Sequence, residues 1–199
     1  ETEAYIVEVD MPVVTGFSNK AFEQAINEEM SETIETYVET IKGYAIEIEE
    51  EGYLTSPYFA GVGYTIQLDN SDYLSLLINY SEYTGGAHGN YYSEAITYDK
   101  KNESILTLND LFIEGVDYMP LLEAQLLKAI EDKRSTSEYG DVLHSWYEGL
   151  KEELVTFTLE ENGLGIHFQP YEIGPYAEGA PSFTLPFDAF EGSLAINTY

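Results

Sequence analysis

The side chains best suited to acid–base or nucleophilic chemistry are three histidines, His88, His144 and His167. No G-x-S-x-G motif is present to form the tight nucleophile turn of a Ser-His-Asp hydrolase. No H-E-x-x-H motif is present either, and the three histidines lack the spacing of metal ligands. His167 alternates with Ile166 and Phe168 and is expected to face solvent, and His144 lies in a polar stretch and is expected at the surface. These histidines therefore predict neither a serine-hydrolase triad nor a zinc site.

Acidic and glycine-rich segments give no metal or phosphate site. Asp69-Asn70-Ser71-Asp72 offers oxygen ligands, but it lacks the glycine at the sixth position and the distal Glu of an EF-hand loop. A hairpin turn explains its composition better. Gly61-Val62-Gly63 lies within an expected strand that no helix follows, so it is not a phosphate-binding loop. Cysteine is absent, which excludes disulfides and thiol chemistry. We predict no metal and no cofactor.

The segment Tyr83-Thr84-Gly85-Gly86-Ala87-His88-Gly89-Asn90 places three glycines around one histidine, between two expected strands. Glycine reaches backbone torsions that other residues adopt only at a cost. One interpretation is a loop that contacts a ligand or is critical for folding, and that holds the imidazole in a fixed place. The other is a wide β connection in which His88 binds nearby carbonyl groups.

A second loop combines proline, glycine and tyrosine in Phe168-Gln169-Pro170-Tyr171-Glu172-Ile173-Gly174-Pro175-Tyr176-Ala177-Glu178-Gly179. Prolines stiffen such a loop, which lowers the entropy cost of presenting Tyr171 and Tyr176 to a partner. The alternative is an Ω-like connection whose tyrosines pack back on the sheet.

Hydrophobic periodicity predicts the elements that position these loops. Steps of three and four residues predict a helix near 18–42, capped by Ser18, whose apolar stripe is Phe22, Ile26, Met30, Ile34, Tyr37 and Ile41. A second helix is expected near 117–134, with Pro120 in its first turn, and a short third helix within 135–150. The intervening and flanking segments alternate as strands joined by short turns. We therefore expect an α+β fold, with two main helices on one face of a mostly antiparallel sheet.

The length of 199 residues fits one domain, whose halves, about 1–85 and about 86–199, share one core. Eight Lys and Arg stand against 37 Asp and Glu, which gives a net charge of −29 spread over the whole chain. Nucleic acids and anionic lipid surfaces are excluded as direct partners, because both need clustered basic residues. The acidity favours a cationic partner or reflects solubility or a salty habitat.

Three motifs follow one another along the chain: segment 83–89, then Leu106-Thr107-Leu108-Asn109-Asp110-Leu111-Phe112, then segment 171–179. In this order they resemble the extracytoplasmic domain of the RsiV-type anti-sigma factors. The same module precedes the catalytic domain of some peptidoglycan deacetylases and occurs in bacterial lipoproteins. The opening strand and helix, through Ile26-Asn27, also look like the N-terminal half of this family, so the resemblance spans nearly the whole chain.

The resemblance implies an extracytoplasmic domain, secreted or anchored to the bacterial surface, with an α+β fold and no catalytic activity. For RsiV-type members it implies lysozyme binding, which exposes the anti-sigma factor to proteolysis and releases its sigma factor. The 199 residues show no transmembrane helix and no sigma-binding segment, and residues 1–5 show no secretory signal. The missing signal indicates either a cytosolic protein or a mature or trimmed form. From the resemblance we expect only the sensor-like domain in these 199 residues.

We expect the partner to be lysozyme or another basic protein, or a cell-wall glycan. The expected ligand-binding residues lie in the two loops: Tyr83, Thr84, Gly85, Gly86, His88, Tyr171, Pro175 and Tyr176. The tyrosines of the second loop would be aromatic anchors, and Thr84 and His88 would add polar contacts. One alternative is a cell-wall or polysaccharide-binding accessory domain, or a hydrolase that uses His88 with a nearby carboxylate as general base. Another is a purely structural spacer domain.

Overall fold

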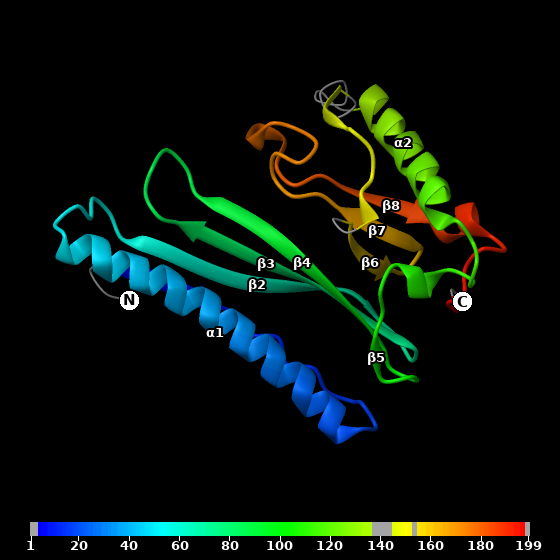
Figure 1. Cartoon of the computed structure of the whole chain (residues 1–199), viewed down its shortest axis with the longest axis horizontal. Coiled ribbons are helices and arrows are strands. Elements are labelled where there is room, and N and C mark those ends of the chain that lie inside the picture. Colours follow the sequence, from blue (N-terminus) through cyan, green and yellow to red (C-terminus); the bar gives the residue numbers. More distant parts are fainter. Residues whose placement is uncertain (1–3, 137–144, 153–154, 198–199) are drawn as a thin grey trace. The chain divides into compact units, whose positions relative to one another are not determined.

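A computed structural model describes residues 4–136, 145–152 and 155–197, and it shows an α+β fold with two main helices and mostly antiparallel strands (Figure 1). The predicted fold class is thus confirmed, but the strands are divided between two sheets. One has the strand order β1-β2-β3-β4-β5 and the other β6-β7-β8. The elements are β1 (Tyr5–Val9), α1 (Lys20–Glu50), β2 (Tyr58–Asp69), β3 (Tyr73–Tyr83), β4 (Asn90–Asp99), β5 (Ser104–Ile105), α2 (Tyr118–Thr136), β6 (Thr156–Glu160), β7 (Gly163–His167) and β8 (Ser182–Pro186).

The chain divides into two compact units, each made of two separate stretches of the sequence. The first contains Glu1–Thr65 and Ile78–Ser93, and the second contains Ile66–Leu77 and Glu94–Tyr199. Strands β2, β3 and β4 therefore each begin in one unit and end in the other. The predicted sharing of one core by the two halves of the chain stays a prediction.

The cap of helix α1 lies one residue later than predicted, and the helix ends eight residues beyond the predicted end. Its cap is Asn19, not Ser18, and the Asn19 side chain accepts hydrogen bonds from the backbone N–H groups of Ala21 and Phe22. The helix continues through Gly43 because its apolar stripe continues. Ala45 is fully buried and Ile48 half-buried, at helical spacing after Ile41.

The predicted stripe of α1 packs on the first sheet as expected. Ile26, Met30, Ile34 and Ile41 are buried, and Val38 and Ile41 contact Ala60 of β2. Tyr37 is half-buried, and its hydroxyl donates a hydrogen bond of 2.8 Å to the Ser81 carbonyl. Its ring lies edge-on to Tyr80, 5.0 Å between centroids, and Tyr80 stacks on Tyr92. Strands β1 and β2, which flank α1 in sequence, pair in parallel.

In the second unit, helix α2 and the three-stranded sheet share the core. Tyr118, Leu122, Leu126 and Ile130 of α2 are buried together with side chains of β7 and β8. The antiparallel pairing of β6 with β7 and of β7 with β8 fixes the position of His167 at the end of β7. A buried hydroxyl pair adds a polar contact: the Ser75 Oγ lies 2.7 Å from the Thr97 Oγ1 and accepts a bond from the Leu159 N–H.

The second motif of the resemblance is structural. Thr107 donates from its backbone N–H and from its hydroxyl to the Asp110 carboxylate, at 2.8 and 2.6 Å. This turn leads into a short 3-10 helix, Asn109–Leu111. Its last residue, Leu111, and the following Phe112 are buried in the core of the second unit. The motif therefore anchors the connection between β5 and α2. No helix among the described residues is long and apolar enough to cross a membrane.

Candidate functional site

The hairpin loop between β3 and β4 has a backbone shape that depends on glycine. Gly85 and Gly86 both have φ of +96°, in the region that side chains disfavour. A Cβ on Gly89 would lie 2.5 Å from the Glu82 carbonyl oxygen, which leaves no room for a side chain. The Tyr83 hydroxyl donates to the Gly86 carbonyl across the loop, at 3.1 Å. The loop is therefore held in one shape by its own residues.

This loop exposes the imidazole of His88. The His88 Nδ1 lies 2.9 Å from the Gly89 carbonyl oxygen, which can only accept, so the proton of this bond is on Nδ1. His88 is exposed and Thr84 is half-buried. The geometry is compatible with both interpretations drawn from the sequence, because the carbonyl contact fixes a ring that solvent and a ligand can reach.

The loop after β7 brings the two predicted aromatic anchors together. The Phe168 N–H donates to the Pro181 carbonyl and closes the base of the loop, and Ile173 is buried at 3% exposure. Tyr171 is 52% exposed and has φ of +68°, a strained value for a residue with a side chain. The rings of Tyr171 and Tyr176 lie 5.6 Å apart at 36°. Pro175 directly precedes the short 3-10 helix Tyr176–Glu178.

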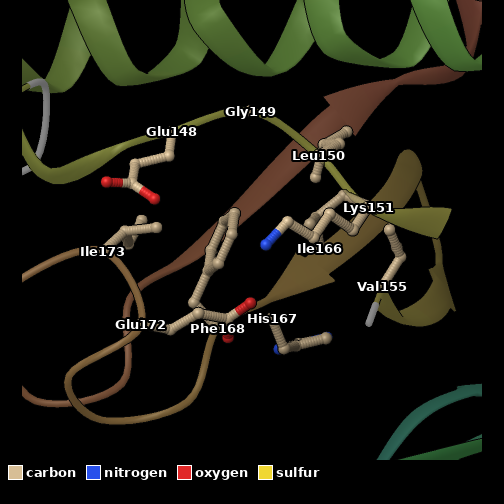
Figure 2. Close-up of a pocket in the computed structure, with 10 residues that line it drawn as sticks. All are labelled: Glu148, Gly149, Leu150, Lys151, Val155, Ile166, His167, Phe168, Glu172 and Ile173. Carbon is tan, nitrogen blue, oxygen red and sulfur yellow. The ribbon is translucent and has the colours of Figure 1, made fainter. Parts of the chain in front are cut away.

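The same loop forms one wall of a small pocket that the sequence did not reveal (Figure 2). Its volume is about 100 Å³, below the roughly 300–1,000 Å³ of most small-molecule sites. Figure 2 shows the Lys151 ammonium directed toward the Phe168 ring, with Ile173 and Glu172 on the loop side. Apolar walls with carboxylates and an ammonium suit one side chain of a protein partner better than a metabolite.

His167 lies at this pocket and corrects one expectation. It is half-buried instead of solvated, and its Nε2 lies 2.8 Å from the hydroxyl of the buried Thr158. Burial lowers the pKa of His167 below its ordinary value, so the ring is neutral at pH 7. Burial also raises the pKa of Glu172, although its carboxylate accepts a bond of 2.7 Å from the Gln169 N–H.

The lowered pKa of His167 predicts a loss of stability in mild acid. Because the folded protein binds this proton less tightly than the unfolded chain, protonation favours unfolding. The contribution of neutral His167 to the free energy of unfolding is fully present above its ordinary pKa of about 6.5. It is lost as pH falls through the lower pKa of the folded state. Urea unfolding at pH 7.5 and 5.5 should show a larger drop for the native chain than for His167→Gln. Equal drops in the two proteins would contradict this assignment.

The two loops belong to different compact units, so each forms its own candidate surface. Tyr83, Thr84, Gly85, Gly86 and His88 lie in the first unit. Tyr171, Pro175 and Tyr176 lie in the second. The surface position expected for His144 and half of the range 135–150, where the third helix was predicted, fall on residues 137–144, outside the described residues.

The acidic turn at 69–72 is the hairpin turn that its composition predicts. The Asn70 Oδ1 accepts the backbone N–H groups of Asp72 and Tyr73, both at 2.8 Å. Asp72 pairs with Lys101, and this charge-assisted bond lowers the pKa of Asp72 to about 2. Within the part of the chain that the structure describes, no group of three or more His, Asp or Glu side chains is placed to hold a metal ion.

Comparison with known proteins places these two loops in two family regions. Residues 1–91 match the family model described as "Deacetylase PdaC", and residues 109–188 match that described as "Protein of unknown function (DUF3298)". The chain is 27% identical over 205 residues to the anti-sigma-V factor RsiV of Bacillus subtilis (strain 168), covering 100% of this chain and 69% of RsiV. It is 22% identical over 112 residues to the peptidoglycan-N-acetylmuramic acid deacetylase PdaC of the same organism, covering 56% of this chain and 24% of the deacetylase.

Solved structures support the fold. A DUF3298 family member from Bacteroides fragilis has a TM-score of 0.75 at 22% identity, over 96% of this chain and 85% of its own. A DUF3298 family protein from Pseudomonas aeruginosa PAO1 has a TM-score of 0.61 at 19% identity, over 76% of this chain and 70% of its own. The resemblance to the RsiV-type family is confirmed by the similarity to RsiV over the full chain, with residues 1–91 similar to the PdaC family and residues 109–188 similar to the DUF3298 family.

Proposed function

We propose that this chain is a non-catalytic binding domain of the bacterial cell envelope, on its outer side, and that it binds a strongly basic protein such as lysozyme. The similarity to an anti-sigma factor and to a peptidoglycan deacetylase supports the envelope location. The observation that carries the binding proposal is the tyrosine pair of the second loop, exposed at Tyr171 and half-buried at Tyr176, on an acidic molecule.

The tyrosine pair has the properties of an interface anchor. Tyrosine supplies a large, rigid contact area at low conformational cost, and its hydroxyl tolerates water. Tyr171 is more than half exposed, while Ile173 fixes the loop in the core between Tyr171 and Tyr176. A partner therefore meets two rings that need little ordering on binding. The adjacent pocket places the Glu148 and Glu172 carboxylates and the Lys151 ammonium beside apolar walls, which suits a polar side chain with an aliphatic stem.

The hairpin loop would supply polar contacts. Its backbone is fixed by Gly85, Gly86 and the hydroxyl of Tyr83, so Thr84 and His88 can be presented without further ordering. We propose these five residues and Tyr171, Pro175 and Tyr176 as the ligand-binding set.

The contacts of the histidines support binding over catalysis. The hydroxyl beside His167 belongs to Thr158, which is fully buried, so a substrate cannot reach it as a nucleophile. The Nδ1 of His88 is engaged by a backbone carbonyl, a contact that shapes the loop.

Binding kinetics with immobilised hen-type and goose-type lysozymes test this proposal. At 10 mM salt, at least one lysozyme should bind, and Tyr176→Ala should raise its dissociation rate roughly 30-fold, as the loss of about 2 kcal/mol at an interface anchor implies. Tyr44→Ala is the control, because Tyr44 is 53% exposed on α1 and lies in neither loop. Absence of binding to either lysozyme, or equal effects of the two substitutions, would overturn the proposal.

The hydrolase alternative needs a separate measurement. The purified chain and its His88→Ala variant should show no turnover of ester, glycan or peptidoglycan substrates. Turnover that disappears in His88→Ala would replace the binding proposal by an enzymatic one.

A further inference from the structure

One face of the first unit's sheet is hollowed into an open groove. Successive strand residues point to opposite faces, and Ala60 of β2 packs against α1 on one face. Phe59, Gly61 and Gly63 of the same strand therefore point to the other face. There they line a groove of about 610 Å³, here called the sheet groove, which lies in the size range of small-molecule sites.

Two glycines form the floor of the sheet groove. A Cβ on Gly61 would lie 2.7 Å from the Phe59 ring and 2.5 Å from the Ser81 Oγ, so both side chains lie close over this glycine. A Cβ on Gly63 would meet no atom within 4 Å, so the space above it is open. The groove therefore places an aromatic ring beside an unfilled stretch of sheet surface.

Polar groups surround that open stretch. Glu8 of β1 is paired in register with Gly61, which puts its exposed carboxylate on the same face, and Asp10 lies two residues further along. Asn79 and Ser81 of β3 add polar groups to the lining, which also includes Val9 and Val62. The Asn79 Oδ1 accepts a hydrogen bond of 2.8 Å from the Ser93 hydroxyl, which fixes the orientation of the amide. None of the described residues that line the groove is basic.

From this arrangement we propose that the sheet groove binds a non-acidic oligosaccharide. A pyranose ring has an apolar C–H face that fits against an aromatic ring such as Phe59, and it can lie flat only over a floor without side chains. Its hydroxyl groups donate to carboxylates such as Glu8 and Asp10, and they exchange hydrogen bonds with an amide or a hydroxyl. A uronic acid or other acidic sugar is disfavoured, because two carboxylates and no base line the groove.

The proposal does not depend on the tyrosine loops, since the sheet groove lies on strands β1, β2 and β3. Absence of lysozyme binding would therefore not contradict the oligosaccharide proposal, and absence of oligosaccharide binding would not contradict the lysozyme proposal.

Titration of the ¹⁵N-labelled chain, followed by NMR, tests the proposal with four probes. These are the tetramers of N-acetylglucosamine, glucose and galacturonate, and tetralysine as a cationic peptide. At least one neutral tetrasaccharide should shift the amide signals of Gly61 and Gly63 saturably. Tetragalacturonate should bind at least tenfold more weakly.

Gly63→Leu should reduce sugar affinity at least tenfold, because the new side chain fills the open space without displacing any neighbour. Gly43→Leu is the matched control, since Gly43 is exposed on α1 and its Cβ would also meet nothing within 4 Å. Phe59→Ala should weaken binding about as much while the remaining spectrum stays dispersed. Binding of tetralysine alone, equal binding of the acidic sugar, no saturable shift with either neutral sugar, or undiminished affinity in Gly63→Leu would each overturn the proposal.

Discussion

Replacement of Ile34 by Asp is expected to unfold the first unit under conditions in which the native chain is folded. Ile34 is 1% exposed in the middle of α1, and its side chain is part of the stripe that packs on the sheet. A carboxylate at this position would be buried without a partner, which costs several kcal/mol. Because a whole domain is stable by only about 5–15 kcal/mol, one such substitution removes most of the stability available.

Urea and thermal unfolding followed by far-UV circular dichroism measure this effect, because α1 is the longer of the two main helices. The control is Thr33→Asp, which places the same carboxylate on the exposed side of the helix at the neighbouring position. Thr33→Asp should leave the midpoint nearly unchanged. An unchanged midpoint in Ile34→Asp would show that the stripe does not form the core of this unit.

The helices were predictable because their signals are local. Apolar residues at steps of three and four define the inner face of α1, and in the structure they are buried apart from Phe22 and Tyr37, which are half-buried. The predicted end near 42 was too early because the apolar periodicity continues beyond Gly43. Ala45 and Ile48 continue the stripe and carry the signal that extends the helix to Glu50.

The division into two sheets was not predictable from periodicity. Alternation shows that a segment is a strand and which of its residues share a face, but it does not identify the neighbouring strand. Strand β2 illustrates this: Ile66 continues the alternation of Ala60 and Val62, yet it is 53% exposed where the strand passes from one unit to the other. Strands β1 and β2 pair in parallel because helix α1 lies between them in the chain and returns it to the same end of the sheet. Alternation within each strand does not indicate this pairing.

The candidate site was predictable only where its signals are local in sequence. Tyr171 and Tyr176 lie five residues apart, and the prolines and glycines between and around them indicate a stiff loop. The pocket beside them was not found, because Glu148 and Lys151 reach it from a distant segment. His167 was misplaced because alternation with Ile166 and Phe168 indicates only which face it occupies. Its burial depends on the segments that cover that face.

The association rate with a basic protein is expected to fall about 100-fold between 0.01 and 0.15 M salt. A net charge of −29 attracts a cationic partner from a distance, and the Debye length shrinks from about 30 Å to about 8 Å over this range. Dissociation depends on short-range contacts and should change much less. The two rate constants from the lysozyme experiment therefore separate long-range attraction from local recognition.

Two sets of substitutions make this separation testable in one experiment. Replacing Glu28, Glu32 and Glu35 together by Gln removes three charges from the exposed side of α1, outside both loops. This variant should associate more slowly at low salt and dissociate at the native rate. Tyr176→Ala should show the reverse, with a faster dissociation and an unchanged salt dependence of association. If binding disappears completely at 0.15 M salt and Tyr176→Ala has no effect, the attraction is nonspecific. An electrostatic field without a rigid apolar patch speeds the encounter of two proteins but does not select a partner.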